Sequence, residues 1–210
     1  MLRILIADDH TVVRKGLKHI LLEEFPAAEV DEVPDAGEMI KKIMNGRWDI
    51  VISDLNMPGR SGLDALAQIK IMEPTLQVLI LSIHPEDHYA LRVLKAGASG
   101  YLSKDSAPEE LVKAVQKVLL GKKYISPAIA EKLASSFTDN ADKVAHESLS
   151  NREFDVMKLI ASGKTVSDIA EILSLSITTI STYRGRVMAK MGLKTNADLT
   201  KYAMELQLIS

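Results

Sequence analysis

Residues 49–58 read Asp-Ile-Val-Ile-Ser-Asp-Leu-Asn-Met-Pro, an apolar run followed by an acid and a turn. The hydrophobic residues are consecutive and do not alternate with polar ones, which is typical of a strand covered on both faces of a sheet. We therefore predict a strand over residues 49–53. Similar short runs predict further strands over residues 3–7, 29–33, 77–82 and 100–103.

Amphipathic, helix-like patterns separate these strands. The alternation of strands and helices predicts an α/β fold, a doubly wound five-stranded parallel sheet with helices on both faces. The run at 29–33 contains Asp31 and Glu32, so we expect it at an edge of the sheet. The helices are expected at about residues 11–24, 36–46, 62–72, 86–96 and 108–120.

Polar side chains follow or end four of the predicted strands. Asp8 and Asp9 come directly after the first strand, and Asp54 follows the third. Ser82 ends the fourth strand, and Lys104 follows the fifth. Because ligands bind beyond the carboxyl ends of the strands in open α/β sheets, we expect these side chains to converge on one site.

The chemistry of these groups favours phosphoryl transfer. Clustered carboxylates repel one another, and a hard divalent cation, Mg²⁺ or Mn²⁺, relieves the repulsion through oxygen ligands. A carboxylate beside such an ion, here Asp54, can attack a phosphoryl donor and form an aspartyl phosphate. Lys104 would neutralise the oxygens of the transferred group, and Ser82 would donate a hydrogen bond to one of them.

The sequence carries, in order, Asp8-Asp9, Asp54-Leu55-Asn56-Met57-Pro58-Gly59, Ser82, Tyr101 and Lys104. This set, spread over residues 1–120, resembles the receiver domains of bacterial two-component response regulators, which have a flavodoxin-like fold. The resemblance implies that the acid pair and the phospho-acceptor Asp54 hold the metal ion, with the backbone carbonyl of Asn56. It also implies a switch in which the Ser82 hydroxyl moves toward the phosphoryl group while the Tyr101 ring turns inward.

Three positions depart from the receiver pattern. Ile83 follows Ser82 where the family usually has a small residue, so its side chain is expected to narrow access to the phosphoryl group. His84 stands where the family often tunes hydrolysis of the aspartyl phosphate, although a surface-loop role is the simpler reading. Asp105 replaces the usual proline after Lys104, so an X-Pro cis bond is excluded there. Taken singly, Asp8 could be only a helix cap and Tyr101 only a half-buried sheet residue.

The alternation of strand and helix patterns ends after residue 120, which predicts a domain boundary there. We predict a receiver domain over 1–121, a linker with a short helix over 122–147, and a DNA-binding domain over 148–210. Pro127 suits the first turn of the short helix, which is expected to run to Phe137. Residues 138–148 are polar and mixed in charge, as in a linker.

From residue 149 onward the pattern is all-α, and it predicts a four-helix helix-turn-helix domain. Ser150 and Glu153 form a capping-box pattern at the start of the first helix, and Ser176 caps the third. A tight turn over residues 174–176 separates the second and third helices, which is the arrangement that reads DNA in the major groove. The helices are expected at 151–162, 166–173, 177–191 and 196–206.

The third of these helices carries the predicted DNA contacts. Residues 176–194 contain basic side chains and no acid, and one local basic face is enough for phosphate contacts. Gly185 permits close approach of the backbone to DNA, at a cost in helix propensity. The groove-facing residues are expected to be Thr178, Ser181, Thr182, Gly185 and Arg186, and the phosphate contacts Arg184, Lys190 and Lys194.

Residues 149–207 carry Leu149-Ser150-Asn151-Arg152-Glu153, Ile169-Ala170-Glu171, 176–184 and Lys190-Met191-Gly192-Leu193. These motifs resemble the LuxR-type DNA-binding domain, and with the receiver the chain resembles a NarL/FixJ-type response regulator. The resemblance implies a sensor histidine kinase as phosphoryl donor and double-stranded DNA as target. It also implies a phosphorylation-promoted homodimer on two half-sites about 10 bp apart. The family often has lysine where this chain has Ser167, Thr178 and Ser181, which predicts a shallow salt dependence of DNA binding.

The composition narrows the function classes further. The chain has no cysteine, so disulfides and thiolate metal sites are excluded. No apolar run reaches the roughly 20 residues that span a bilayer, so we expect a cytoplasmic protein with no membrane partner. We expect a regulator and no enzyme, and three alternatives stay open. The first is a phosphatase with an aspartyl nucleophile, although Asn56 stands where such an enzyme needs its second acid. The second is a regulator whose DNA binding does not depend on phosphorylation. The third is a C-terminal domain that serves as a helical protein-interaction module.

Overall fold

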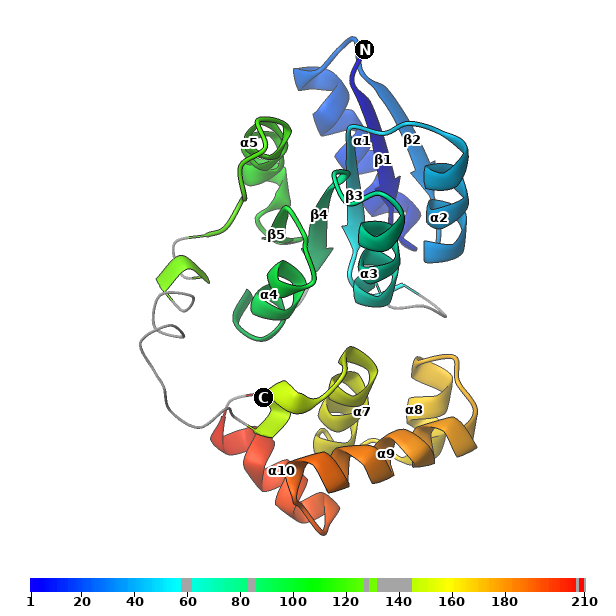
Figure 1. Ribbon diagram of the computed structural model, residues 1–210, viewed down its shortest axis with the longest axis vertical. Coiled ribbons are helices and arrows are strands. Elements are labelled where there is room, and N and C mark those ends of the chain that lie inside the picture. The colour runs from blue at the N-terminus through cyan, green and yellow to red at the C-terminus, as the bar shows by residue number, and fades with distance from the viewer. Residues whose placement is uncertain (58–61, 83–85, 127–128, 132–144, 207, 210) are drawn as a thin grey trace. The chain divides into compact units, whose positions relative to one another are not determined.

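The structure is a computed structural model, and it describes residues 1–57, 62–82, 86–126, 129–131, 145–206 and 208–209. The chain divides into two compact units, Met1–Asp139 and Asn140–Ser210. The first is an α/β unit and the second is helical (Figure 1). None of the helices in the described ranges has the length and apolar content needed to cross a membrane.

The first unit is built on a five-stranded parallel sheet with the order β2-β1-β3-β4-β5. The predicted fold is confirmed, and the acidic second strand lies at an edge as expected. Four strands have the predicted bounds, and the third begins and ends one residue later. The strands are β1 (Arg3–Ala7), β2 (Glu29–Val33), β3 (Ile50–Asp54), β4 (Gln77–Ser82) and β5 (Gly100–Ser103).

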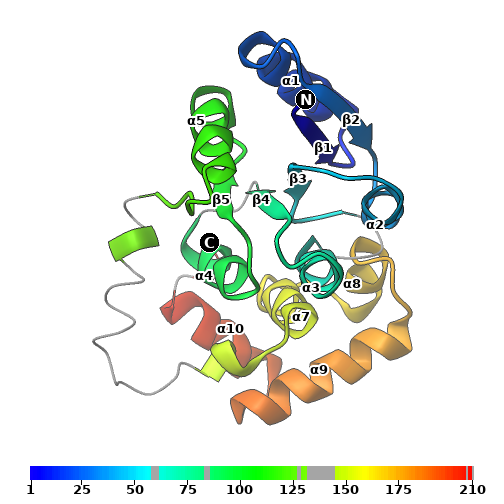
Figure 2. The same cartoon turned by 45° about the horizontal axis from the view of Figure 1, so that its top comes forward.

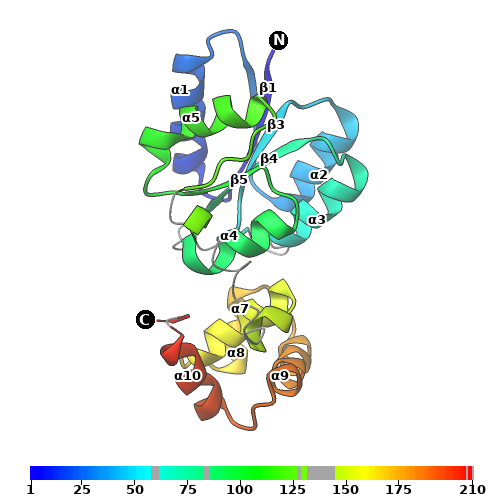
Figure 3. The ribbon, with the colours of Figure 1, turned by 60° about the vertical axis from the view of Figure 1, so that its left-hand side comes forward.

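Helices cover both faces of this sheet. Figure 3 shows α1 and α5 together on one face, with α2 and α3 on the other. On the α1/α5 face, Ile4 and Ile6 of β1 pack into one apolar cluster with Leu17 and Leu111. Leu5, which lies between them and points the other way, is also fully buried, so β1 is covered on both faces as its unbroken apolar run predicts. The helices are α1 (Thr11–Glu24), α2 (Ala36–Asn45), α3 (Gly62–Met72), α4 (Glu86–Lys95) and α5 (Ala107–Leu119).

The chain after α5 pairs with the exposed edge of β5. Tyr124 forms an isolated parallel bridge with Gly100, and its N–H donates to the Ser99 carbonyl at 2.9 Å. A Cβ on Gly100 would lie 2.7 Å from the Tyr124 carbonyl oxygen, so the close approach requires glycine. The predicted linker therefore begins as a backbone partner of the sheet.

The rest of the predicted linker is described in part. Residues 129–131 are helical, and the remainder of the predicted helix Pro127–Phe137 lies outside the described residues. A 3₁₀ turn, η1 (Ala145–Ser148), replaces the end of the expected irregular linker. Its His146 ring nitrogen Nδ1 lies 2.9 Å from the Tyr202 hydroxyl, which ties the turn to the C-terminal helix.

The second unit is a four-helix domain whose predicted helices are all found, most of them one residue shorter at the C-terminal end. Figure 2 shows α9 as its long helix. Side-chain capping explains where these helices begin: Ser150, Thr165 and Thr195 each accept from the third residue of α7, α8 and α10, and Ser176 does so for α9. The helices are α7 (Asn151–Ala161), α8 (Val166–Ile172), α9 (Ile177–Met191) and α10 (Asn196–Glu205).

Candidate functional site

The sheet brings the predicted polar residues to its carboxyl edge. Asp8 follows β1, and Asp54 and Ser82 are the last residues of β3 and β4. All three residues are buried, with exposed fractions of 0, 3 and 0 %. Lys104 follows β5, and its backbone N–H donates to the Ser82 carbonyl at 2.8 Å.

Lys104 joins two of the carboxylates. Its ammonium nitrogen lies 2.7 Å from Asp8 Oδ2 and 2.8 Å from Asp54 Oδ2. The side chain is 11 % exposed, so these contacts form where water screens charge weakly. The Lys104 ammonium therefore lies between the carboxylates at the ends of β1 and β3.

Burial sets the proton affinities of this group. Desolvation raises the pKa of the Asp54 carboxyl from its ordinary 3.8, although the hydrogen bond and charge of Lys104 oppose the rise. Burial alone would lower the pKa of the Lys104 ammonium, but the hydrogen bonds and charges of Asp54 and Asp8 outweigh it and raise that pKa. Lys104 consequently holds its proton beside the Asp54 carboxylate.

The backbone around Asp54 is held from several sides. The Asn56 N–H donates to Asp54 Oδ1 at 3.2 Å, and the Leu55 N–H donates to the Leu81 carbonyl at 2.9 Å. Gly62, the first residue of α3, packs onto the same segment, and a Cβ there would lie 2.3 Å from the Asp54 carbonyl oxygen. Glycine at 62 is therefore needed to bring α3 against the end of β3.

The switch residues predicted from the resemblance are also buried. Tyr101, on β5, has an exposed fraction of 0 %, so it is a full core residue and not half-buried. Ser82 is equally buried at the end of β4. Ile83, expected to narrow access to the site, and His84, for which a surface-loop role is the simpler reading, lie outside the described residues.

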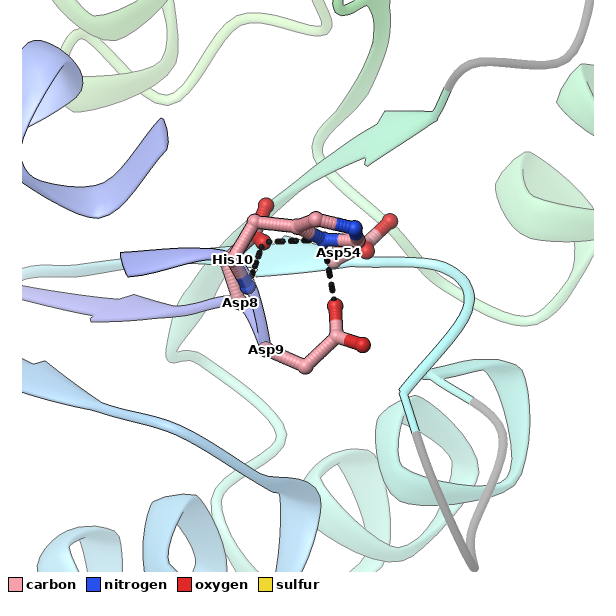
Figure 4. A group of neighbouring side chains, drawn as sticks. All are labelled: Asp8, Asp9, His10 and Asp54. Atoms are coloured by element: carbon pink, nitrogen blue, oxygen red, sulfur yellow. Dashed lines mark hydrogen bonds and ion pairs between the residues drawn. The ribbon is translucent and has the colours of Figure 1, made fainter. Parts of the chain in front are cut away.

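One member of the site was not predicted. His10, the residue after the acid pair, turns its ring toward the carboxylates (Figure 4). Its Nδ1 lies 2.7 Å from Asp9 Oδ1 and 3.2 Å from Asp8 Oδ1. A histidine next to two acids is visible in the sequence, but the direction of its side chain depends on the turn between β1 and α1.

The acidic residues fit a divalent cation. Asp8, Asp9, His10 and Asp54 each offer a ligand atom, and these atoms lie within 4.8 Å of one another. Asp9 Oδ1 is buried and has no hydrogen-bond partner within the described part of the chain. Carboxylate oxygens of this kind, one of them unsatisfied, are the ligands that hard divalent ions prefer.

The predicted groove-facing residues lie on one exposed face of α9. Thr178, Ser181, Thr182 and Gly185 are exposed and recur at helical spacing, and Arg186 is exposed beside them. On the opposite side the helix packs into the domain through the buried side chains of Ile180, Val187 and Met191.

The basic residues of this region have unequal surroundings. Arg184 donates from Nε to Asn196 Oδ1 at 3.0 Å, while Arg186 and Lys194 are exposed. Lys190, predicted to contact phosphate, lies 2.6 Å from Glu153 Oε2, an oxygen of the α7 capping box. Its ammonium therefore stabilises the junction of α7 and α9, a contact between residues distant in sequence that local patterns do not reveal.

Comparison with known proteins identifies both units. Residues 4–116 match the response regulator receiver domain family, and residues 147–203 match the luxR family of bacterial regulatory proteins. The first match alone covers more than half of the chain. The chain belongs to the NarL/FixJ family of response regulators. In this family a receiver domain is joined to a DNA-binding domain that regulates transcription, and this response regulator has both.

The similarity to individual relatives extends over nearly the whole of both chains. The oxygen regulatory protein NreC of Staphylococcus carnosus is 36 % identical, over 99 % of this chain and 99 % of its own length. The response regulator UvrY of Escherichia coli is 34 % identical, over 97 % and 94 %. The solved structure of RcsB from Salmonella enterica serovar Typhimurium, bound to the promoter rprA with the phosphomimetic BeF3-, is 28 % identical, covers 96 % and 98 %, and has a TM-score of 0.64.

Proposed function

We propose that this response regulator accepts a phosphoryl group on Asp54 from a sensor histidine kinase. In the phosphorylated form it binds double-stranded DNA as a homodimer and regulates transcription in the cytoplasm. The observation that carries the proposal is the Lys104 ammonium, which contacts both Asp8 and Asp54 at the carboxyl edge of the sheet. We assign residues 1–121 to the receiver domain, 122–147 to the linker and 148–210 to the DNA-binding domain.

In the transfer step an oxygen of the Asp54 carboxylate attacks the phosphorus atom of a phosphohistidine. The new bond joins that oxygen to phosphorus, the phosphorus–nitrogen bond breaks, and the imidazole of the kinase leaves with the electron pair. Lys104 neutralises negative charge on the transferred group, since its ammonium already lies 2.8 Å from Asp54 Oδ2. Ser82, the last residue of the neighbouring strand β4, donates a hydrogen bond to a phosphoryl oxygen in this proposal.

A divalent ion, Mg²⁺ or Mn²⁺, would supply charge neutralisation and orientation of the phosphoryl oxygens when bound. The residues proposed to hold it are Asp8, Asp9 and Asp54, with the backbone carbonyl of Asn56. The unsatisfied buried oxygen of Asp9 and the clustering of the carboxylates support this assignment.

The signal is proposed to leave the receiver through Ser82 and Tyr101. Movement of the Ser82 hydroxyl toward the phosphoryl group would select one position of the Tyr101 ring, shifting the receiver between two states. The Tyr124 bridge lies on the same strand as Tyr101, so the linker is attached to the strand that carries the switch. The DNA-binding domains would then pair on half-sites about 10 bp apart.

The DNA contacts are proposed to come from the exposed face of α9. RcsB, whose structure resembles this chain, is bound to promoter DNA in its solved complex. The groove-facing set is Thr178, Ser181, Thr182, Gly185 and Arg186, and the phosphate-contacting set is Arg184 and Lys194. Lys190 was also predicted to contact phosphate, but it is left out of this proposal because its ammonium pairs with Glu153.

The direct test follows mass, oligomeric state and DNA binding after incubation with acetyl phosphate and Mg²⁺. Wild-type protein and an Asp105→Asn control are expected to gain the mass of one phosphoryl group, to dimerise and to bind a mapped promoter more tightly. Asp54→Asn is expected to do none of these. Equal DNA affinity and oligomeric state with and without the phosphodonor would contradict the coupling, and phosphorylation of Asp54→Asn would contradict the acceptor.

A phosphatase that uses an aspartyl nucleophile remains the second candidate because of the same buried acid site. Such enzymes need a second acid close to the nucleophile, and position 56 holds asparagine. Steady release of inorganic phosphate from small phosphate esters by the wild type, abolished in Asp54→Asn, would favour the enzyme.

A further inference from the structure

We propose that the His10 imidazole is a further ligand of the divalent-ion site and makes the site prefer borderline transition-metal ions, such as Co²⁺ or Ni²⁺, over Mg²⁺. The inference rests on the metal site of the proposed function and deepens it. Figure 4 shows the ring of His10 beside the carboxylates of Asp8 and Asp9, with Asp54 on the neighbouring strand end.

The contacts place His10 and Lys104 on different oxygens. Lys104 takes Asp8 Oδ2, whereas His10 Nδ1 lies 3.2 Å from Asp8 Oδ1 and 2.7 Å from Asp9 Oδ1. The imidazole nitrogen therefore lies beside Asp8 Oδ1 and Asp9 Oδ1, whereas Lys104 pairs with the other oxygen of Asp8.

The contact with Asp9 has the spacing of two ligands of one ion. Only 2.7 Å separates the two atoms, and Asp9 Oδ1 has no hydrogen-bond partner within the described ranges. All four candidate ligand atoms lie within 4.8 Å of one another, and ligands on opposite sides of an ion with bonds of about 2.1 Å lie about 4.2 Å apart. Only small movements are then needed for one ion to contact an imidazole nitrogen and the carboxylate oxygens.

Apart from the hydrogen bond between its ring Nδ1 and Asp8 Oδ1, at 3.2 Å, and the neighbouring Asp9 carboxylate, the His10 side chain has a small structural role. It occupies the N-cap position of α1, but its side chain makes no capping hydrogen bond. The side chain is 65 % exposed, so replacing it removes little packing. Its turn is held instead by the backbone, because the His10 N–H donates to Asp8 Oδ1 at 2.8 Å.

The donor set decides which ions gain from His10. Mg²⁺ prefers oxygen ligands and retained waters, so the imidazole does not raise the affinity of the site for Mg²⁺. Later first-row divalent ions bind imidazole nitrogen well, and a mixed nitrogen and carboxylate set raises their affinity relative to Mg²⁺. Removing the ring should accordingly lower the affinity for Co²⁺ while leaving that for Mg²⁺ unchanged or higher.

The test uses untagged full-length protein and two matched variants, His10→Asn and His19→Asn. His19 lies on α1, is 76 % exposed and is not among the candidate ligands. Titration calorimetry with Co²⁺ and with Mg²⁺ gives the ratio of the two affinities. We expect His10→Asn to reduce this preference by about 10-fold or more and His19→Asn to leave it unchanged.

Proton NMR of the Co²⁺-loaded protein supplies a readout that a structural role would not move. Wild type and His19→Asn are expected to show one hyperfine-shifted, exchangeable ring proton of a coordinated imidazole, which His10→Asn lacks. An affinity ratio unchanged in His10→Asn, or persistence of that resonance, would overturn the proposal. Phosphorylation by acetyl phosphate with Mg²⁺ tests the proposed function separately, so either idea can fail alone.

Discussion

Lys104 is the positive charge that two buried carboxylates share. Replacement by methionine keeps the length of the side chain but leaves Asp8 and Asp54, exposed by 0 and 3 %, without the ammonium between them. Removing one partner of a buried ion pair is strongly destabilising, so we expect Lys104→Met to lower the free energy of unfolding by about 3 kcal/mol. Thermal unfolding of the full-length chain measures the loss.

A matched exposed pair provides the control. Lys42 lies 2.8 Å from Asp31, but the two side chains are 50 and 36 % exposed. Lys42→Met should therefore lower the free energy of unfolding by less than about 1 kcal/mol. Adding Mg²⁺ should raise the melting temperature of Lys104→Met more than that of wild type. Similar losses in the two variants would contradict the role of Lys104 as counter-charge.

Substitution of Gly185 is expected to change the stability of α9 and its affinity for DNA in opposite directions. A Cβ on this residue meets nothing within 4 Å, and Gly185 lies on the exposed face with Thr182. We expect Gly185→Ala to stabilise the protein by about 0.5–1 kcal/mol, because alanine has the higher helix propensity. DNA affinity should fall by about 10-fold, about 1.4 kcal/mol, because the methyl group enters the face that approaches the groove.

Gly16 offers the comparison for that experiment. It is an exposed glycine of α1, and a Cβ there also meets nothing within 4 Å. Gly16→Ala should stabilise the receiver by a similar amount and leave DNA affinity unchanged, as measured by thermal unfolding and fluorescence anisotropy. Undiminished DNA binding by Gly185→Ala would show that the backbone does not approach DNA at this position.

Among the elements, α7 depends on a charge placed at its N-terminus. Burial alone would raise the pKa of Glu153, but hydrogen bonds from Lys190 and from the Ser150 backbone outweigh it and hold this pKa below its ordinary 4.5. A carboxyl with a depressed pKa in the folded protein stabilises it above the ordinary value, and that contribution disappears as the pH falls through the depressed pKa.

Glu153→Ala should accordingly lower the free energy of unfolding of the C-terminal domain by about 2 kcal/mol at neutral pH. About half of this comes from the cap and about half from the partly exposed ion pair. The difference from wild type should shrink as the pH falls below 4.5, which circular dichroism melts at several pH values would show. Glu205→Ala, at an exposed pair with Lys201, is the control and should change little. A difference constant from pH 7 to 3 would contradict the ionic part.

Local patterns predicted the helices and strands well because each element is determined largely by a short stretch of sequence. Short apolar runs predicted β1, β4 and β5 with their observed bounds, and a run interrupted by Asp31 and Glu32 predicted those of β2. Ser150 with Glu153 predicted the start of α7. The missed cap pairs of α8 and α10, Thr-x-x-Asp in each case, are local signals that the same rule could have found.

Contacts between distant residues could not be predicted in this way. Pairing of Lys190 with Glu153 depends on how α9 packs on α7, and pairing of Tyr124 with Gly100 depends on where the chain returns after α5. The acidic site was predictable because one topological rule places all strand ends together. The ring of His10 was not, since a turn dihedral decides its direction.

For the whole molecule, the number of free cations on the DNA-facing side sets the salt dependence of binding. Each protomer exposes Arg184, Arg186 and Lys194 there, while Lys190 already pairs with Glu153. If each free cation neutralises one phosphate, a dimer contacts about six, and log K should fall with log salt concentration with a slope of about −5. Arg186→Ala should bring the slope to about −3.5, because it removes one contact per protomer at about 0.9 each. Lys190→Ala, measured well below its melting temperature, should change the slope by less than about 1. Anisotropy titrations on a mapped promoter, between low and physiological salt, measure this slope. A wild-type slope near −8 would mean that Lys190 and the domain's remaining lysines also contact phosphate. In that case the exposed arginines would not be the main electrostatic link between this regulator and DNA.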